Sequence, residues 1–263
     1  MKKAGIIGVL IAACIIVAAA YLRVTPSITI EPEPDIGTLP GDIKSIEDIE
    51  EIKGENDVNE PLFTDDLKAD IDSGYLILVN KSNGLDRDYK PDDLTAIKYY
   101  ASNRGADGRF MREAAANAFH SLVEEALKSD LTVVVTTAYR SYSFQSVLYN
   151  NYVAADGPAA DRYSARPGKS EHQTGLAADV SSPSVNYELT ADFAGTAEGK
   201  WLAANAHLFG FIIRYPNGKE EITGYLYEPW HIRYAGLTAA EYIYTRNITL
   251  EEYLQLIEEE TER

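Results

Sequence analysis

Two short segments, Ser170–Asp179 and Glu228–His231, constrain this chain more than any other part of its sequence. They have the sequences SEHQTGLAAD and EPWH, and they hold two of the four histidines in the chain. His172, Asp179 and His231 together supply two imidazoles and one carboxylate, which is the ligand set of a catalytic zinc site with an open fourth position. The sequence therefore predicts a fold that brings both segments to one metal ion.

Glu228 is the candidate general base of this predicted site, because it lies three residues before His231. A zinc hydrolase needs a carboxylate that does not bind the metal and that takes a proton from water. Pro229 fixes the backbone between the two side chains, which helps to aim the carboxylate. We therefore expect Glu228 to act beside the metal and not as one of its ligands.

The other reactive side chains fit structural roles better. His120 lies in an amphipathic segment and His207 precedes Leu208, and neither has an acid or a second histidine at ligand spacing. A serine nucleophile at Ser170 is disfavoured, because no GxSxG-type elbow surrounds it, and we expect this residue to line the site. Cys14 is the only cysteine, so the rest of the chain can form neither a disulfide nor a thiolate zinc site.

The first 23 residues predict a membrane segment. Ala4–Leu22 is apolar throughout and follows Lys2 and Lys3, and roughly 20 such residues cross a bilayer as a helix. The two lysines predict an N-terminus that stays inside, so we expect a single-pass cell-membrane protein with an extracytoplasmic catalytic domain. A retained anchor is preferred, because the run exceeds a usual signal sequence. A cleaved signal peptide at Ala18–Ala20 and a lipid-modified Cys14 are the alternatives.

Residues 24–61 predict an acidic linker. Eleven acidic residues and two lysines lie between Val24 and Glu60, so this stretch carries −9 of the net charge of −17, and it also contains four prolines. A segment of this composition buries too little apolar surface to offset the entropy lost on ordering. Its prolines and like charges keep it extended. We therefore expect the linker to hold a single domain of residues 62–263 away from the membrane. The negative charge also argues against a nucleic-acid partner.

Hydrophobic patterns in the domain predict a mixture of helices and strands. We expect helices at Met111–Lys128, Tyr142–Tyr152, Trp201–Phe209, Thr238–Asn247 and Leu250–Glu260, and strands at Tyr75–Val79, Leu131–Thr137, Gly175–Val180, Phe211–Tyr215 and Trp230–Tyr234. No regular βαβ repeat is present, so the predicted class is α+β with a mainly antiparallel central sheet flanked by helices. Two geometries suit His172 and Asp179: one helical face, or a loop entering a strand, which Gly175 favours.

The chain closely resembles the zinc D-alanyl-D-alanine carboxypeptidases of the VanY type, which trim peptidoglycan stem peptides. The resemblance runs from about Tyr75 to Leu254. Besides the two segments above, it rests on motifs in family order: YRSY at Tyr139–Tyr142 with Gln145, YSARPG at Tyr163–Gly168, GKWL at Gly199–Leu202, GFI at Gly210–Ile212 and RYP at Arg214–Pro216. This resemblance implies a zinc D,D-peptidase-like fold.

The resemblance also implies roles for the site residues. The three predicted ligands would bind Zn²⁺, and Glu228 would accept a proton and later pass it to the leaving amine. Arg140 would pair with the terminal carboxylate of the substrate or with the oxyanion, since a planar guanidinium matches two oxygens. Gln145 and Ser170 would add hydrogen bonds at the same end of the peptide.

The implied activity is removal of the C-terminal D-alanine from peptidoglycan stem peptides by a monomeric zinc D,D-carboxypeptidase. Two alternatives stay open: an L,D-carboxypeptidase of the same family, acting on tetrapeptides, and a non-catalytic cell-wall-binding module. The presence of Glu228 argues against the module. The D,D and L,D activities are not separated by the sequence, because the depth of the pocket depends on its loops.

Overall fold

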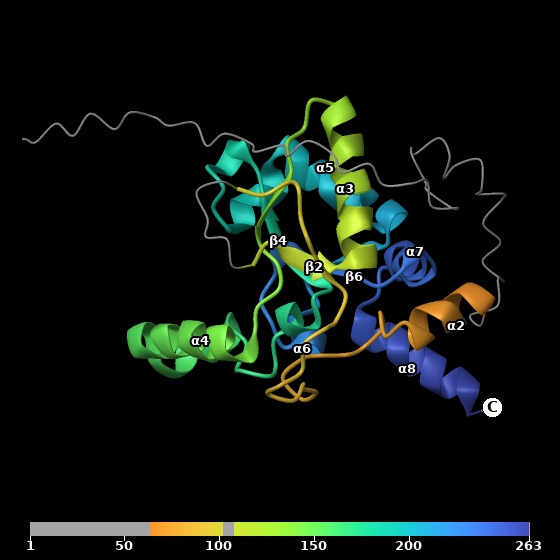
Figure 1. The fold of residues 1–263 in the computed structure, drawn as a ribbon, viewed down its shortest axis with the longest axis horizontal. Coiled ribbons are helices and arrows are strands. Elements are labelled where there is room, and N and C mark those ends of the chain that lie inside the picture. The colour runs from red at the N-terminus through yellow and green to blue at the C-terminus, as the bar shows by residue number, and fades with distance from the viewer. Residues whose placement is uncertain (1–63, 102–107, 263) are drawn as a thin grey trace, which may run out of the picture.

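The computed structural model describes residues 64–101 and 108–262 of the chain (Figure 1). The predicted membrane segment, with Cys14, and the acidic linker lie outside the described residues, so both stay predictions. Among the helices that the structure does describe, none has the length and hydropathy that a membrane crossing needs.

A four-stranded antiparallel sheet lies at the centre of the described chain. Its strands follow the order β3 (Val134–Thr137), β4 (Ala177–Ser181), β6 (Glu228–Tyr234) and β5 (Phe211–Tyr215). A separate antiparallel pair joins β1 (Leu94–Ala96) to β2 (Phe110–Arg112). The two inner strands, β4 and β6, therefore come from the two sequence segments that carry the predicted ligands.

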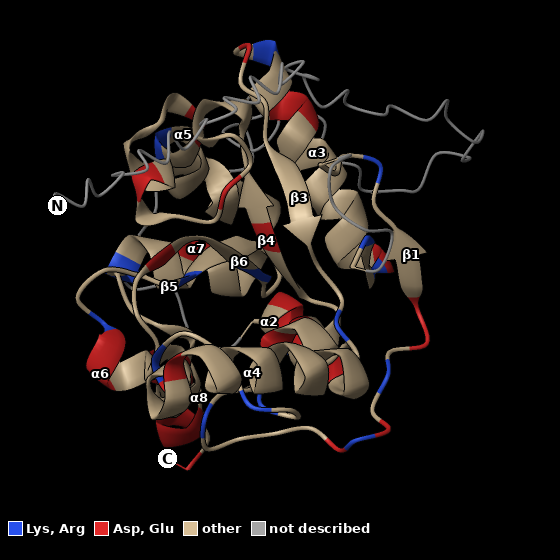
Figure 2. Cartoon of the chain, turned by 90° about the vertical axis from the view of Figure 1, so that its left-hand side faces the viewer, with Lys and Arg blue, Asp and Glu red and all other residues tan. Residues whose placement is uncertain are grey.

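Helices lie on both sides of this sheet. Their bounds are α2 (Asp65–Asp72), α3 (Glu113–Lys128), α4 (Tyr142–Asp156), α5 (Ala197–Asn205), α6 (Glu220–Thr223), α7 (Leu237–Arg246) and α8 (Leu250–Thr261). Figures 1 and 2 place α3 and α5 on one side of β4 and β6, and α4, α6 and α8 on the other. The predicted α+β class with an antiparallel sheet flanked by helices is confirmed.

Helix α3 shows how the sequence pattern produces this packing. Its buried side chains recur every three or four residues, at Ala115, Ala116, Phe119, Leu122, Val123 and Ala126. They share one core with Val180 of β4, Phe211 of β5 and Ile232 of β6. Full burial of a Phe or Leu side chain contributes roughly 1.5–3 kcal/mol, so this stripe fixes α3 against the sheet.

A second core joins the C-terminal helices to the sheet edge. Leu67 of α2, Ala240 and Ile243 of α7 and Tyr253 of α8 pack together with Ile212 of β5. The start of α8 is closed by a capping box, in which the Thr249 hydroxyl accepts from the backbone of Glu252 and the Glu252 carboxylate accepts from the backbone of Thr249. This arrangement confirms the predicted helix.

The predicted strand at Tyr75–Val79 is wrong, because this segment forms turns and irregular backbone. The carbonyls of Tyr75 and Ile77 accept hydrogen bonds from the Arg233 guanidinium, at 2.7 and 2.9 Å, and not from a neighbouring strand. Leu76 and Val79 are buried nonetheless. Their apolar pattern therefore reports burial of the segment and not a place in the sheet.

Most other predicted elements are present, with ends that shift by a few residues. The helix expected at Trp201–Phe209 is divided: α5 ends at Asn205, and a 3-10 helix then runs to Phe209. Gly210 ends it with φ of 77°, a value that favours glycine. Helices α2 and α6 and the β1–β2 pair were not predicted.

Candidate active site

The three predicted metal ligands come together in one buried cluster. His172 lies on the short 3-10 helix η2 (Glu171–Thr174), Asp179 on β4 and His231 on β6. Asp179 and His231 are direct partners in the β4–β6 register. Each of the three side chains offers a ligand atom, and these atoms lie within 4.8 Å of one another. The antiparallel sheet thus brings together residues that are far apart in the sequence.

The path between His172 and Asp179 is a loop that enters a strand, and the alternative of one helical face is wrong. Gly175 ends η2 in the left-handed region, with φ of 71°. A side chain at this position would also approach Leu94 to 2.8 Å. The positive φ therefore favours glycine at position 175, and Leu94 would have to shift to admit a side chain there.

The donor atoms of the two histidines suit a cation. His172 Nδ1 donates to the carbonyl of Ala138 at 2.7 Å, which leaves Nε2 unprotonated, buried and without a hydrogen-bond partner among the described residues. This Nε2 lies 3.3 Å from Asp179 Oδ2. His231 Nδ1 lies 3.0 Å from Asp179 Oδ1. Two imidazole nitrogens facing one buried carboxylate fit a zinc-type divalent cation.

The local electrostatics shift the pKa values of the two imidazoles in opposite directions. Burial, assisted by the charge of Arg140, lowers the pKa of His172 to about 4. Burial also acts to lower the pKa of His231, but hydrogen bonding to Asp179 and Glu171 outweighs it and raises that pKa to about 9. For Asp179, burial opposes ionisation, yet the two imidazoles hold its pKa well below the ordinary value. The cluster therefore favours positive charge beside the Asp179 carboxylate.

Glu228 stands beside the ligand cluster and is not part of it. It begins β6, where it pairs in register with Tyr215 of β5, and its Oε2 lies 3.6 Å from His231 Nδ1. Burial raises the pKa of Glu228 to about 7. A carboxylate with a pKa near neutrality is well matched to proton transfer at neutral pH.

Arg140 follows β3 and is held in place by two side chains. Its Nη2 donates to Asp179 Oδ2 at 3.2 Å, and its Nη1 donates to Gln145 Oε1 at 3.1 Å. Gln145 in turn donates from Nε2 to the carbonyl of Ala165 at 2.7 Å. Both ends of the Gln145 amide are thus engaged, so the structure shows it supporting Arg140. Direct contact of Gln145 with a peptide stays a prediction.

All of these side chains, together with buried Ser170, line one cavity of about 320 Å³. The rest of its wall is mainly aromatic, and sequence reasoning assigned no role to these residues: Tyr152, Tyr163, Tyr215, Tyr225 and Trp230. Tyr163, Tyr215 and Trp230 belong to the motifs YSARPG, RYP and EPWH. Membership in these motifs was the sequence feature that could have identified them as lining residues. The cavity therefore combines a polar centre with apolar walls, as peptide-sized ligands require.

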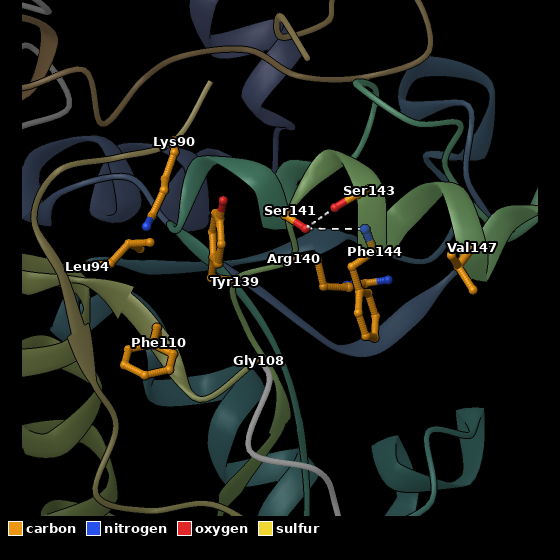
Figure 3. A pocket seen from close by; sticks show the side chains of 10 residues that line it. All are labelled: Lys90, Leu94, Gly108, Phe110, Tyr139, Arg140, Ser141, Ser143, Phe144 and Val147. Atoms are coloured by element: carbon orange, nitrogen blue, oxygen red, sulfur yellow. Dashed lines mark hydrogen bonds between the residues drawn. The ribbon is translucent and has the colours of Figure 1, made fainter. Parts of the chain in front are cut away.

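A second cavity, of about 640 Å³, adjoins the first at Arg140. Figure 3 shows its lining, which includes Phe110 of β2 and Phe144 and Val147 of α4. Arg140 is the residue that lines both cavities, so it lies between them.

The two remaining histidines lie outside the cluster and outside the lining of the first cavity. His120 Nε2 accepts from the backbone of Lys98 at 3.1 Å, and burial lowers the pKa of His120 to about 4. His207 stacks on Tyr244, with ring centroids 3.6 Å apart. Both contacts fit the structural roles that were expected.

Comparison with known proteins gives consistent matches. The VanY family model, described as D-alanyl-D-alanine carboxypeptidase, matches residues 108–237. YodJ of Bacillus subtilis (strain 168), provisionally named a carboxypeptidase, is 44% identical over 184 residues, which cover 69% of this chain and 67% of YodJ.

Two solved structures agree with this match. The LdcB LD-carboxypeptidase, studied for peptidoglycan recognition, has 44% identity and a TM-score of 0.66, and the match covers 69% of this chain and 86% of that one. A mutant of the vancomycin resistance D,D-pentapeptidase VanY, in complex with Zn(II), has 32% identity and a TM-score of 0.57, with 68% and 98% covered.

Proposed function

The chain belongs to the VanY family of carboxypeptidases, and from this premise we propose that it is a zinc-dependent hydrolase of peptidoglycan stem peptides. The proposed reaction removes one C-terminal D-alanine. The observation that carries the proposal is the buried cluster of His172, Asp179 and His231, with Glu228 beside it in a cavity that also holds Arg140.

The three clustered side chains are the proposed zinc ligands. The His172 nitrogen that lacks a hydrogen-bond partner and the Asp179 carboxylate beside it fit a cation, and the VanY structure in complex with Zn(II) supports zinc as that cation. When bound, zinc supplies a Lewis acid that makes water a better nucleophile at neutral pH and polarises a peptide carbonyl.

Glu228 is the proposed proton carrier. Its Oε2 would take a proton from the attacking water and return it to the leaving amine, as general acid–base catalysis requires. Two observations support this role: Glu228 stands outside the ligand cluster, and burial raises the pKa of its carboxyl to about 7.

Arg140 is the proposed reader of the substrate's C-terminal carboxylate. The Arg140 side chain is 13% exposed, and Gln145 and Asp179 fix its guanidinium at the cavity wall. A fixed, largely buried cation favours a carboxylate over a neutral group, because loss of the carboxylate removes a charge-assisted hydrogen bond. Ser170 lies in the same wall and would add a hydrogen bond to the peptide.

Two stem peptides fit the proposed reaction. The D,D reaction on a pentapeptide is supported by the description of the family model and by the VanY structure. The L,D reaction on a tetrapeptide is the second candidate, and it is favoured by the higher identity to LdcB, 44% against 32% for VanY.

Incubation of the purified full-length chain with a pentapeptide and a tetrapeptide tests the proposal, with mass spectrometry of the products. We expect loss of one alanine from at least one peptide, abolished by a chelator and restored by Zn²⁺. The peptide that is cleaved decides between the two reactions. If zinc binds but neither peptide is cleaved, the chain is a non-catalytic wall-binding module and the proposal is wrong.

We further propose that the protein is a monomer tethered to the cell membrane by residues 1–23, with residues 24–61 as spacer. The catalytic domain, residues 62–263, would then lie outside the cell. The support is the apolar run behind Lys2 and Lys3 and the acidic, proline-containing stretch after it. A peptidoglycan substrate also requires an extracytoplasmic site.

A further inference from the structure

A buried carboxylate lies behind the predicted ligand His231. The side chain of Glu171 is fully buried, and its Oε2 lies 3.5 Å from His231 Nε2. The other ring nitrogen, Nδ1, faces Asp179 at 3.0 Å and Glu228 at 3.6 Å. Neither Glu171 Oε2 nor His231 Nε2 has a hydrogen-bond partner among the described residues, and both atoms are buried. Glu171 Oε2 is therefore placed to accept a hydrogen bond from His231 Nε2.

Two fully buried arginines hold the Glu171 carboxylate in this orientation. Arg214 Nε donates to Glu171 Oε1 at 2.7 Å, and Arg233 Nη1 donates to the same oxygen at 2.8 Å. Both guanidinium groups bind Oε1, so Oε2 stays directed at His231. A carboxylate that accepts two charge-assisted hydrogen bonds is held more firmly than one with neutral partners.

The two arginines are themselves anchored to distant parts of the chain. Arg214 makes a bidentate pair with Glu251 of α8, at 2.8 and 2.6 Å. Arg233 donates to the carbonyls of Tyr75 and Ile77. The position of Glu171 is thus fixed by β5, β6, α8 and the segment after α2.

Stability alone does not explain such a network. Taking several charges out of water is expensive, and replacement of a buried ion pair by well-packed apolar side chains is often neutral or stabilising. A network with three fully buried charges, and a fourth at its edge on Glu251, next to a predicted metal ligand therefore calls for a second role.

Control of the His231 ring supplies that role. A histidine binds a metal through one ring nitrogen, and the hydrogen bond of the other nitrogen selects the tautomer and orients the ring. His172 shows the same device, because its Nδ1 donates to the carbonyl of Ala138. For His231, the carboxylate oxygen Oε2 of Glu171 lies 3.5 Å from Nε2 and can accept from it.

We propose that Glu171 is a positioning residue of the metal centre: it accepts the Nε2 proton of His231 and so directs Nδ1 towards the metal. This inference rests on the proposed metal-dependent function. It assigns to Glu171 no contact with substrate or with the reacting atoms.

The test is the zinc affinity of Glu171→Gln in the full-length chain, measured by competition with a chromophoric chelator. The arginines can only donate, so the amide oxygen should face them and the amide NH₂ should face His231 Nε2. That contact favours the wrong tautomer, and we expect Zn²⁺ to bind about 10–100-fold more weakly, the usual effect of losing such a partner.

Glu251→Gln is the matched control, because it weakens the same buried network without touching His231. We expect it to lower the thermal stability of the metal-free protein but to change zinc affinity less than about 3-fold. If both variants lose zinc affinity equally, Glu171 acts only through the stability of the network and the proposal is wrong. It is equally wrong if Glu171→Gln binds Zn²⁺ as tightly as the wild type.

A measurement on the wild type keeps the test independent of variant folding. In zinc-loaded protein labelled with ¹⁵N-histidine, we expect His231 to carry a proton on Nε2 and to bind through Nδ1. A proton on Nδ1 would overturn the proposal. A wild type that binds no Zn²⁺ at all would instead refute the metal-dependent function on which the inference rests.

Discussion

Replacement of Arg140 by alanine should remove the preference of the enzyme for a free C-terminal carboxylate. The Arg140 side chain is 13% exposed, and its Nε has no hydrogen-bond partner among the described residues. Breaking a buried charge pair typically costs about 3–5 kcal/mol. Asp179 still faces the Arg140 guanidinium when the substrate carboxylate is missing, so we expect the lower end of this range. The wild type should therefore lose about 3 kcal/mol, on the order of 100-fold in kcat/KM, when the substrate is amidated.

The assay compares kcat/KM for free-acid and amidated peptides in the wild type and in Arg140→Ala. The variant should be slow on the free acid and almost indifferent to amidation. Arg166→Ala is a suitable control, because Arg166 is 65% exposed and pairs with Asp161, and it should keep the full preference. If Arg140→Ala still discriminates as strongly as the wild type, another group reads the carboxylate and the reasoning fails.

Three further outcomes are expected. Glu228→Gln should keep its zinc, measured by metal analysis, but lose about 10²–10⁴-fold in turnover, and a loss below tenfold would exclude Glu228 as the general base. Burial raises the pKa of Asp70 from 3.8 to about 6, so the folded state binds the extra proton and stability falls as pH rises from about 4 to 6. Asp70→Asn should therefore stabilise the protein by roughly 1 kcal/mol at pH 8, a value kept small because this carboxyl is partly exposed. This corresponds to a rise of about 2–4 °C in the melting temperature. No gain is expected near pH 4, and an equal gain at both pH values would contradict this reasoning. Protease added to intact cells should release an active domain that starts near Pro61, and protection until lysis would refute the predicted topology.

The metal cluster could be predicted from the sequence because its residues carry the chemistry themselves. Two histidines and an aspartate in short motifs suggested ligands, and the antiparallel sheet then placed Asp179 opposite His231. The amphipathic pattern of α3 was equally direct, because each buried position reports one face of one helix. Sequence patterns predict a structural feature well when the residues that determine it are close together in the sequence.

Long-range pairing explains what the sequence did not reveal. Glu171 looks like an ordinary surface acid, and its partners Arg214 and Arg233 lie on other elements, β5 and β6, with no spacing rule that links them. The same cause produced the error at Tyr75–Val79. Its carbonyls are occupied by Arg233, a residue more than 150 positions later in the chain.

The pair between Arg214 and Glu251 joins the last helix of the described chain to the buried arginines behind the candidate site. The family match ends at residue 237, before α8 begins. A chain cut before α8 would keep every predicted ligand, yet Arg214 would lose Glu251 and the two guanidinium groups would share the single carboxylate of Glu171. A residue outside the family match therefore balances the charge of two buried arginines inside it, so the interior of the matched region depends on α8 for its electrostatic neutrality.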